Sequence, residues 1–367
     1  MRLFNLLVIL PVVLFRLSAA ASIGIGEQPS AAELSKAGWA ALNAGRIREA
    51  AAAFDEALKA SPRQAPALLG AGVAAHLLGR EEHARRYLLD ALKIDPALTA
   101  ASLLLGNVLY QAGDIDGAIE VYQHALARAP DHRRLLEQLQ AWRKEATLHS
   151  GFGRRLGDHF TVLFEGPAEA ALADRAVEIL ERAYWRIGTA LYTYPADVIT
   201  VVLYTREQFR DITQSPEWAG GAFDGHIRVP VQGALQNRAE FERVLAHEFT
   251  HALVQSVASR GVPFWLHEGL AVCFEGSDLT RKEEQVRRAA SRLPLSRLER
   301  SFGGLSAEDA SLAYAESALA ARALLDQAGA PALVNLLDAL GRGVPFAEAF
   351  EANVLISYSE FQKKLQG

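Results

Sequence analysis

Residues 247–251 read HEFTH, inside the run RVLAHEFTHALV that spans residues 243–254. The apolar residues of this run recur at helical spacing, so we expect a helix from Ala239 to about Val257. Residues four positions apart lie on one face of a helix, with their β-carbons about 5–6 Å apart. His247 and His251 can therefore direct both imidazole rings toward one metal ion, and zinc suits such nitrogen ligands.

Glu248 follows His247 directly and lies about 100° further round the helix. This direction is unsuited to a third ligand and well suited to a base beside the ion. Zinc lowers the pKa of water toward about 7, so a neighbouring carboxylate can complete its deprotonation. The spacing therefore predicts that Glu248 is a general base.

A third ligand is expected downstream, in the run PFWLHEGLA at residues 263–271. Residues 264–275 predict a second apolar helix, interrupted only by the HEG of 267–269. A carboxylate in such a helix must be paired, protonated or bound to a metal. Glu268 is thus the preferred third ligand, and His267 and Asp278 are the alternatives.

The N-terminal half has an internal period of 34 residues, in the gapless segments 31–64, 65–98 and 99–132. Small residues, which let antiparallel helices pack closely, and prolines, which end a helix, recur in five columns. These are Gly38, Gly72 and Gly106; Gly45, Gly79 and Gly113; Ala50, Ala84 and Ala118; Ala57, Ala91 and Ala125; Pro62, Pro96 and Pro130. The pattern resembles the tetratricopeptide repeat, and residues 131–146 predict its capping helix.

The sequence thus predicts an all-α array at residues 31–146. The resemblance implies a concave surface that binds a protein partner or a peptide substrate, and the alternative is a spacer or an oligomerisation element. Residues 147–158 contain three glycines and show no periodicity, which predicts a linker.

The remaining residues, 159–367, predict a domain that begins with strands and ends in helices. Residues 159–166 and 222–231 alternate, and residues 198–204 form an apolar run, so three strands are expected. Pro230 favours an edge position for the last of them. Residues 264–365 are mostly helical in pattern, which gives an α+β class for this domain.

HEFTHALV followed by PFWLHEGLA resembles the gluzincin metallopeptidases, a thermolysin-like zincin group. The similarity is greatest to the peptidase-MA-like families that are fused to tetratricopeptide repeats, and it covers roughly residues 159–367. It implies that His247, His251 and Glu268 bind Zn2+ and that Glu248 is the general base.

The resemblance also implies an edge strand that pairs with the substrate backbone. GGAFDGHIRVPV at residues 220–231 matches this strand, with Phe223, Gly225, Ile227 and Val229 as the candidate substrate-binding residues. Tyr314 is the candidate for stabilising the oxyanion, and an ordinary packed tyrosine is the alternative. The Gly-x-Met-Glu-Asn motif of the aminopeptidases is absent from the sequence, which favours an endopeptidase.

Composition and the N-terminus limit the class of protein further. The formal charge of −5 and the lack of a basic stripe argue against a nucleic-acid binder. Cys273 is the single cysteine, so the chain cannot form an internal disulfide. A basic residue, an apolar run at 3–15 and an A-x-A pattern predict a signal peptide at residues 1–21, with an uncleaved membrane anchor as the alternative.

Together these features predict an exported zinc peptidase, periplasmic or otherwise extracytoplasmic, whose repeats recruit a substrate or a protein partner. Two alternatives remain. One is a non-catalytic repeat adaptor with a degenerate peptidase-like domain, and the other is a zinc hydrolase that acts on a different amide or an ester.

Overall fold

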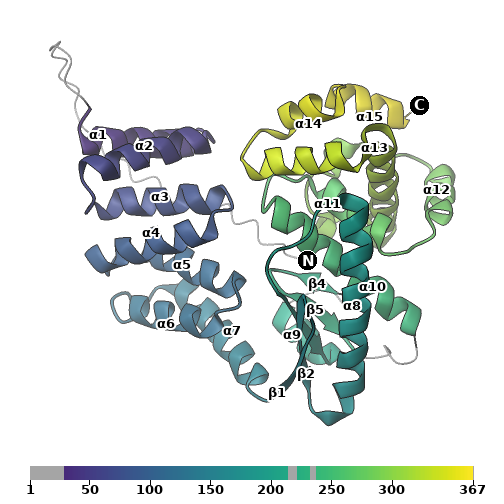
Figure 1. The fold of residues 1–367 in the computed structure, drawn as a ribbon, viewed down its shortest axis with the longest axis horizontal. Coiled ribbons are helices and arrows are strands. Elements are labelled where there is room, and N and C mark those ends of the chain that lie inside the picture. Colours follow the sequence, from purple (N-terminus) through teal and green to yellow (C-terminus); the bar gives the residue numbers. More distant parts are fainter. Residues whose placement is uncertain (1–28, 214–220, 232–236, 367) are drawn as a thin grey trace.

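The protein consists of a helical array and a mixed α/β domain that lie side by side (Figure 1). The computed structural model describes residues 29–213, 221–231 and 237–366. The segment predicted as a signal peptide or anchor, residues 1–21, lies outside these ranges. Among the described helices, none is both long enough and apolar enough to cross a membrane.

Seven antiparallel helices form the N-terminal array, two for each repeat and one at the end. They are α1 (Ala31–Asn43), α2 (Ile47–Ala60), α3 (Ala65–Leu77), α4 (Glu81–Ile94), α5 (Thr99–Gln111), α6 (Ile115–Leu126) and α7 (Arg133–His149). The predicted all-α array is confirmed, and α7 is the expected capping helix.

The first glycine column of the repeats explains how closely each helix pair packs. In every repeat, this glycine faces a large buried side chain of the second helix. An added β-carbon would lie 2.8 Å from Phe54 at Gly38, 2.9 Å from Leu88 at Gly72 and 2.3 Å from Tyr122 at Gly106. No larger residue than glycine fits these positions without moving a core side chain, so the columns seen in the sequence are a packing requirement.

The second domain contains a five-stranded mixed sheet. Its strands are β1 (Phe152–Leu156), β2 (Phe160–Glu165), β3 (Ile199–Tyr204), β4 (Ala222–Phe223) and β5 (Ile227–Pro230), in the order β1-β2-β3-β5-β4. The pairs β2–β3 and β3–β5 are parallel, and the two outer pairs are antiparallel. Residues 147–158 are therefore not a linker: α7 continues to His149, and β1 pairs its backbone with β2.

The single strand expected at residues 222–231 is instead a hairpin. Here β4 and β5 are joined by a turn at Asp224–His226, in which Gly225 has φ 104°. The strand β5 lies between β3 and β4, so the edge of the sheet is β4 and not the Pro230 strand. The turn reverses the direction of the chain, whereas the alternation of polar and apolar residues predicted one continuous strand.

The helices of the second domain pack either directly on this sheet or against other helices of the domain. They are α8 (Ala170–Leu191), α9 (Arg206–Thr213), α10 (Arg238–Val257), α11 (Phe264–Phe274), α12 (Leu279–Arg288), α13 (Ala307–Gly341), α14 (Phe346–Val354) and α15 (Tyr358–Gln366). One hydrophobic core runs from the sheet through α8 and α10 to α13 and α14. The predicted α+β class of this domain is confirmed.

Candidate metal centre

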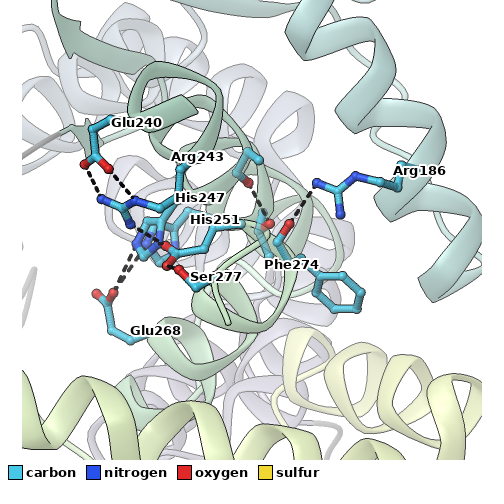
Figure 2. Close-up of polar contacts among 11 residues, drawn as sticks. Arg186, Glu240, Arg243, His247, His251, Glu268, Phe274 and Ser277 are labelled. Carbon is cyan, nitrogen blue, oxygen red and sulfur yellow. Dashed lines mark hydrogen bonds and ion pairs between the residues drawn. The ribbon is translucent and has the colours of Figure 1, made fainter. Parts of the chain in front are cut away.

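Two neighbouring helices bring the predicted ligands together. His247 and His251 project from α10, and Glu268 projects from α11 toward both imidazole rings (Figure 2). Each histidine Nε2 lies 3.5 Å from Glu268 Oε2. The three potential ligand atoms all lie within 4.8 Å of one another. The structure therefore makes one site of residues that are up to 21 positions apart in the sequence.

The position of Glu268 depends on the close approach of α11 to α13. At Gly269 an added β-carbon would lie 2.2 Å from the carbonyl oxygen of Ser317, so only glycine permits this contact. At the other end of α11, the Arg186 guanidinium donates to the carbonyl of Phe274 at 2.8 Å. Both contacts fix the helix that carries the carboxylate.

The two separations between the carboxylate and the imidazoles suit a tetrahedral zinc ion. Two ligand atoms at 2.0–2.1 Å from such an ion would lie about 3.3–3.4 Å from each other. The observed separation of 3.5 Å is close to this value and longer than an ordinary hydrogen bond. Two imidazoles and one carboxylate are also a usual donor set for zinc sites that keep one position open.

A second carboxylate orients the first histidine. Glu275, which follows α11, accepts a hydrogen bond from His247 Nδ1 at 2.7 Å. The same Glu275 oxygen accepts from Arg243 Nη1 at 2.9 Å, and Ser277 donates to the other oxygen. Arg243 is in turn paired with Glu240 (Figure 2). In the neutral tautomer that this hydrogen bond favours, Nδ1 carries the proton and Nε2 carries the lone pair that can bind a metal.

Glu275 is not among the site residues predicted from the sequence. It lies seven residues after Glu268, which is two helical turns, and both side chains therefore leave the same face of α11. This seven-residue spacing from Glu268 is the sequence feature from which Glu275 could have been predicted. The contact with His247 itself depends on how α10 and α11 pack.

The protein groups perturb each other's protonation strongly. Burial disfavours the charged form of His247, but the neighbouring Glu268 and Glu275 outweigh it and raise its pKa to about 10. Burial alone would raise the pKa of Glu268, but the charges of His251 and His247 hold that pKa well below its usual range. A cation is therefore strongly favoured beside Glu268, and a metal ion must compete with a proton on His247.

Glu248 lies beside the site, buried, and burial raises the pKa of its carboxyl group. Gly221, which directly precedes β4, lies against this carboxylate: a β-carbon added at Gly221 would lie 2.6 Å from Glu248 Oε1. The sheet edge thus begins next to the carboxylate predicted to act as the base. An extended peptide paired with β4 would pass close to Glu248.

The two alternative ligands lie elsewhere. His267 stacks on the ring of His251, with centroids 4.5 Å apart and planes 14° apart, and is outside the group of converging ligand atoms. Burial lowers the pKa of His267 to about 3, which keeps it neutral. Asp278 caps the start of α12 by accepting from the backbone nitrogen of Thr280 at 2.9 Å. The geometry therefore favours Glu268.

Tyr314 is half-buried on α13 and packs edge-on against Phe302, with ring centroids 5.3 Å apart. Burial, followed by the negative charges of Glu268 and Glu248, raises the pKa of its hydroxyl far above the ordinary value. The group therefore stays protonated and remains a hydrogen-bond donor. Its role in holding an oxyanion stays a prediction.

The predicted substrate-binding residues are divided by the hairpin. Phe223 lies on the edge strand β4 and is half-buried. Ile227 and Val229 lie on the inner strand β5 and are only 0% and 1% exposed, so they belong to the core. Gly225 lies in the turn against Gln111 of the array. The structure contradicts a substrate-binding role for Ile227 and Val229, because the protein itself already covers their side chains. Gly225 is partly exposed, and its role stays a prediction.

Comparison with known families agrees with both domains. Residues 186–365 match the sequence model of the Peptidase MA superfamily, and residues 35–99 and 79–142 match two tetratricopeptide repeat models. The fold and the converging ligand atoms thus define a peptidase-like domain attached to a repeat array. More particularly, the protein is a tetratricopeptide repeat array fused to a Peptidase MA superfamily domain, a superfamily that is commonly zinc-dependent.

More distant similarities are limited. A segment of 59 residues is 48% identical to cellulose synthase operon protein C of Komagataeibacter xylinus, and the match spans 16% of this chain and only 4% of that protein. The first tetratricopeptide repeat domain of Spaghetti (RPAP3), solved with an HSP90 peptide, covers 32% of this chain and 96% of its own, at 17% identity and TM-score 0.31. The myosin chaperone UNC-45 of C. elegans covers 89% of this chain and 31% of its own, at 13% identity and TM-score 0.31.

Proposed function

We propose that the protein is an exported zinc-dependent peptidase, and an endopeptidase in particular. The observation that carries the proposal is the convergence of His247 and His251 on one oxygen of Glu268, with Glu248 beside them. The match of residues 186–365 to the Peptidase MA superfamily supports it independently. Export rests on the sequence pattern of residues 1–21, and the endopeptidase preference rests on the missing aminopeptidase motif.

In this proposal His247, His251 and Glu268 hold the zinc ion. Bound zinc supplies a Lewis acid that acidifies water and polarises the carbonyl of the scissile peptide bond. Glu275 keeps His247 in the tautomer whose Nε2 faces the site. The ligand shell is therefore held by hydrogen bonds as well as by the packing of α10 and α11.

Glu248 moves the proton. Its carboxylate takes a proton from the water that attacks the carbonyl carbon, and it then gives that proton to the leaving amine as the C–N bond breaks. Tyr314 remains protonated, and it donates a hydrogen bond to the carbonyl oxygen as negative charge develops there. An extended peptide pairs with the side of β4 that no described strand occupies, next to Phe223 and Glu248.

The repeat array contributes binding. Tetratricopeptide repeats generally mediate protein–protein interactions, so the array recruits a protein substrate or a partner.

One experiment tests the function directly. The purified full-length chain should carry about one zinc ion, as expected for three ligands and one open position, and should cleave an unstructured protein such as casein. Glu248→Gln should retain the metal and lose about 10²–10⁴-fold in cleavage rate, the usual contribution of a general acid–base group. Well-folded protein that binds no zinc, or undiminished cleavage by Glu248→Gln, would refute the proposal. Metal-loaded protein that cleaves nothing would favour the adaptor alternative.

A further inference from the structure

A fully buried arginine lies where the two domains meet. Arg228 belongs to β5 of the peptidase domain and is 0% exposed. Its Nη1 donates to Glu145 Oε1 and to the Tyr204 hydroxyl, both at 2.7 Å, and its Nη2 donates to the Tyr110 hydroxyl at 2.6 Å. Its Nε donates to Asp224 Oδ1 at 3.0 Å. All three nitrogens of the guanidinium are therefore bonded, and two carboxylates balance its charge.

The array supplies two of these partners, already joined to each other. Tyr110 comes from α5 and Glu145 from α7, and the tyrosine hydroxyl donates to Glu145 Oε2 at 2.7 Å. The Tyr110 ring stacks on Trp142, with centroids 5.1 Å apart and planes 21° apart. Tyr110 and Glu145, which bond to Arg228, are thus held in place within the third repeat and its capping helix. We call this set of Arg228, Tyr110 and Glu145 the clamp.

The turn between β4 and β5 also rests on the third repeat. A β-carbon on Gly225 would lie 3.2 Å from the carbonyl oxygen of Gln111, at the end of α5. His226 is 9% exposed and meets the ring of Tyr110 edge-on, with centroids 5.9 Å apart. The hairpin is therefore covered by the array on this side and cannot shift without breaking these contacts.

The other side of the same hairpin borders the metal site. Arg228 is the register partner of Ala222 on β4, and Gly221, which precedes Ala222, lies against Glu248. Only a few residues of backbone thus connect the clamp to the carboxylate beside the metal ligands.

We propose that the repeat array is a positioning element of the peptidase site. Through Tyr110 and Glu145 it holds Arg228, and through Arg228 it fixes the edge strand β4 that receives an extended peptide over Glu248. Tyr110, Glu145 and Arg228 are positioning residues, since none of them reaches the reacting atoms. The effect on catalysis rests on the proposed peptidase function. The role of the clamp in holding the hairpin does not depend on that function.

Other contacts keep the domains together when the clamp is weakened. Arg48 of the first repeat donates to the carbonyl of Arg342 at 2.8 Å, and Arg260 donates to the carbonyl of His76 in the second repeat. Removal of one hydroxyl from the clamp should therefore loosen the hairpin locally without separating the array from the peptidase domain.

The test compares two tyrosine-to-phenylalanine variants of the same repeat in the full-length, zinc-loaded chain. Tyr110→Phe removes the hydroxyl that accepts from Arg228 and donates to Glu145 and leaves the direct bond between Arg228 and Glu145 in place. Tyr122→Phe is the matched control, because among the described residues the Tyr122 hydroxyl bonds to the carbonyl of Leu103 alone, inside the array, at 3.2 Å. The measurements are hydrogen–deuterium exchange at residues 222–230, zinc content, and KM and kcat for an extended peptide.

For Tyr110→Phe we expect about tenfold faster exchange in the hairpin, the factor that the loss of one hydrogen bond to a charged group supplies. We expect KM to rise by a similar factor at unchanged zinc content, and Tyr122→Phe to behave as wild type. Glu145→Gln, which keeps an acceptor for Arg228 but removes its charge, should lie between the two.

Each outcome decides the inference. Exchange in Tyr110→Phe that equals that of wild type, or equally fast exchange in Tyr122→Phe, would overturn the clamp. Faster exchange with unchanged KM would overturn the positioning role. Faster exchange in a chain that cleaves no peptide would support the clamp and refute only the proposed function.

Discussion

Removal of the Glu275 carboxylate should weaken zinc binding without removing any ligand. The Glu275 side chain is 3% exposed, and it accepts from His247 Nδ1 at 2.7 Å and from Arg243 Nη1 at 2.9 Å. Loss of a hydrogen bond to a charged group costs about 1.5–3 kcal/mol. Changes to groups that orient a metal-binding histidine usually cost about 10–100-fold in affinity, or about 1.4–2.7 kcal/mol. For Glu275→Ala we therefore expect zinc affinity to fall by about 10–100-fold.

Competition with a chromophoric zinc chelator at neutral pH measures this loss. Glu275→Gln keeps an acceptor for the imidazole and should lose less affinity than Glu275→Ala. Glu240→Ala is the matched control, because Glu240 pairs with Arg243 and makes no contact with His247 among the described interactions. Wild-type affinity in Glu275→Ala, or an equal loss in Glu240→Ala, would show that the hydrogen bond to His247 does not orient a ligand.

Three further predictions concern the ligand, the sheet edge and a buried histidine. Glu268→Ala should lose bound zinc while His267→Ala retains it, as measured by elemental analysis, because only Glu268 joins the converging ligand atoms. Gly221→Ala places a β-carbon 2.6 Å from Glu248 Oε1 and should lower kcat by about 10²-fold at full zinc occupancy, whereas Gly304→Ala, which meets open space, should not change kcat. Burial lowers the pKa of His149 from 6.5 to about 4, so the unfolded chain binds the extra proton between these values, and the free energy of unfolding should fall as the pH drops from 6.5 to 4. We expect a loss of about 1–3 kcal/mol in wild type and a flatter profile in His149→Gln, measured by chemical denaturation at each pH.

The sequence indicated the repeat array in detail because its signals are local. Each glycine of the first column sits opposite one large side chain in the same repeat, and both recur every 34 residues. Such contacts need only two adjacent helices, and the period itself identifies them. The extension of α7 to His149 and the pairing of β1 with β2 were hidden, because a strand in a glycine-containing segment forms only when a partner strand is available.

Part of the candidate metal centre could also be predicted from local sequence signals. Two histidines one turn apart share a face in any α-helix, so their convergence follows from the local geometry. Glu268 could be ranked first from its apolar surroundings, but its distance from the imidazoles depends on the contact between α11 and α13 at Gly269. Glu275 was not predicted, because an acidic residue at the end of a helix usually faces solvent. Here the packing of α10 against α11 places His247 within hydrogen-bonding distance of Glu275.

By itself, the sequence determined the repeats, the helix that carries the two candidate histidine ligands, and the preference for Glu268 over His267 and Asp278, since these depend on period, spacing and the cost of burying charge. Tertiary structure alone decided which strand forms the sheet edge, and it placed Arg228 between the two domains. From the alternation of polar and apolar residues alone, Arg228 is predicted to be an exposed polar residue of a half-buried strand. It is buried because Tyr110 and Glu145, more than 80 residues away in sequence, contact its guanidinium where the two domains pack together.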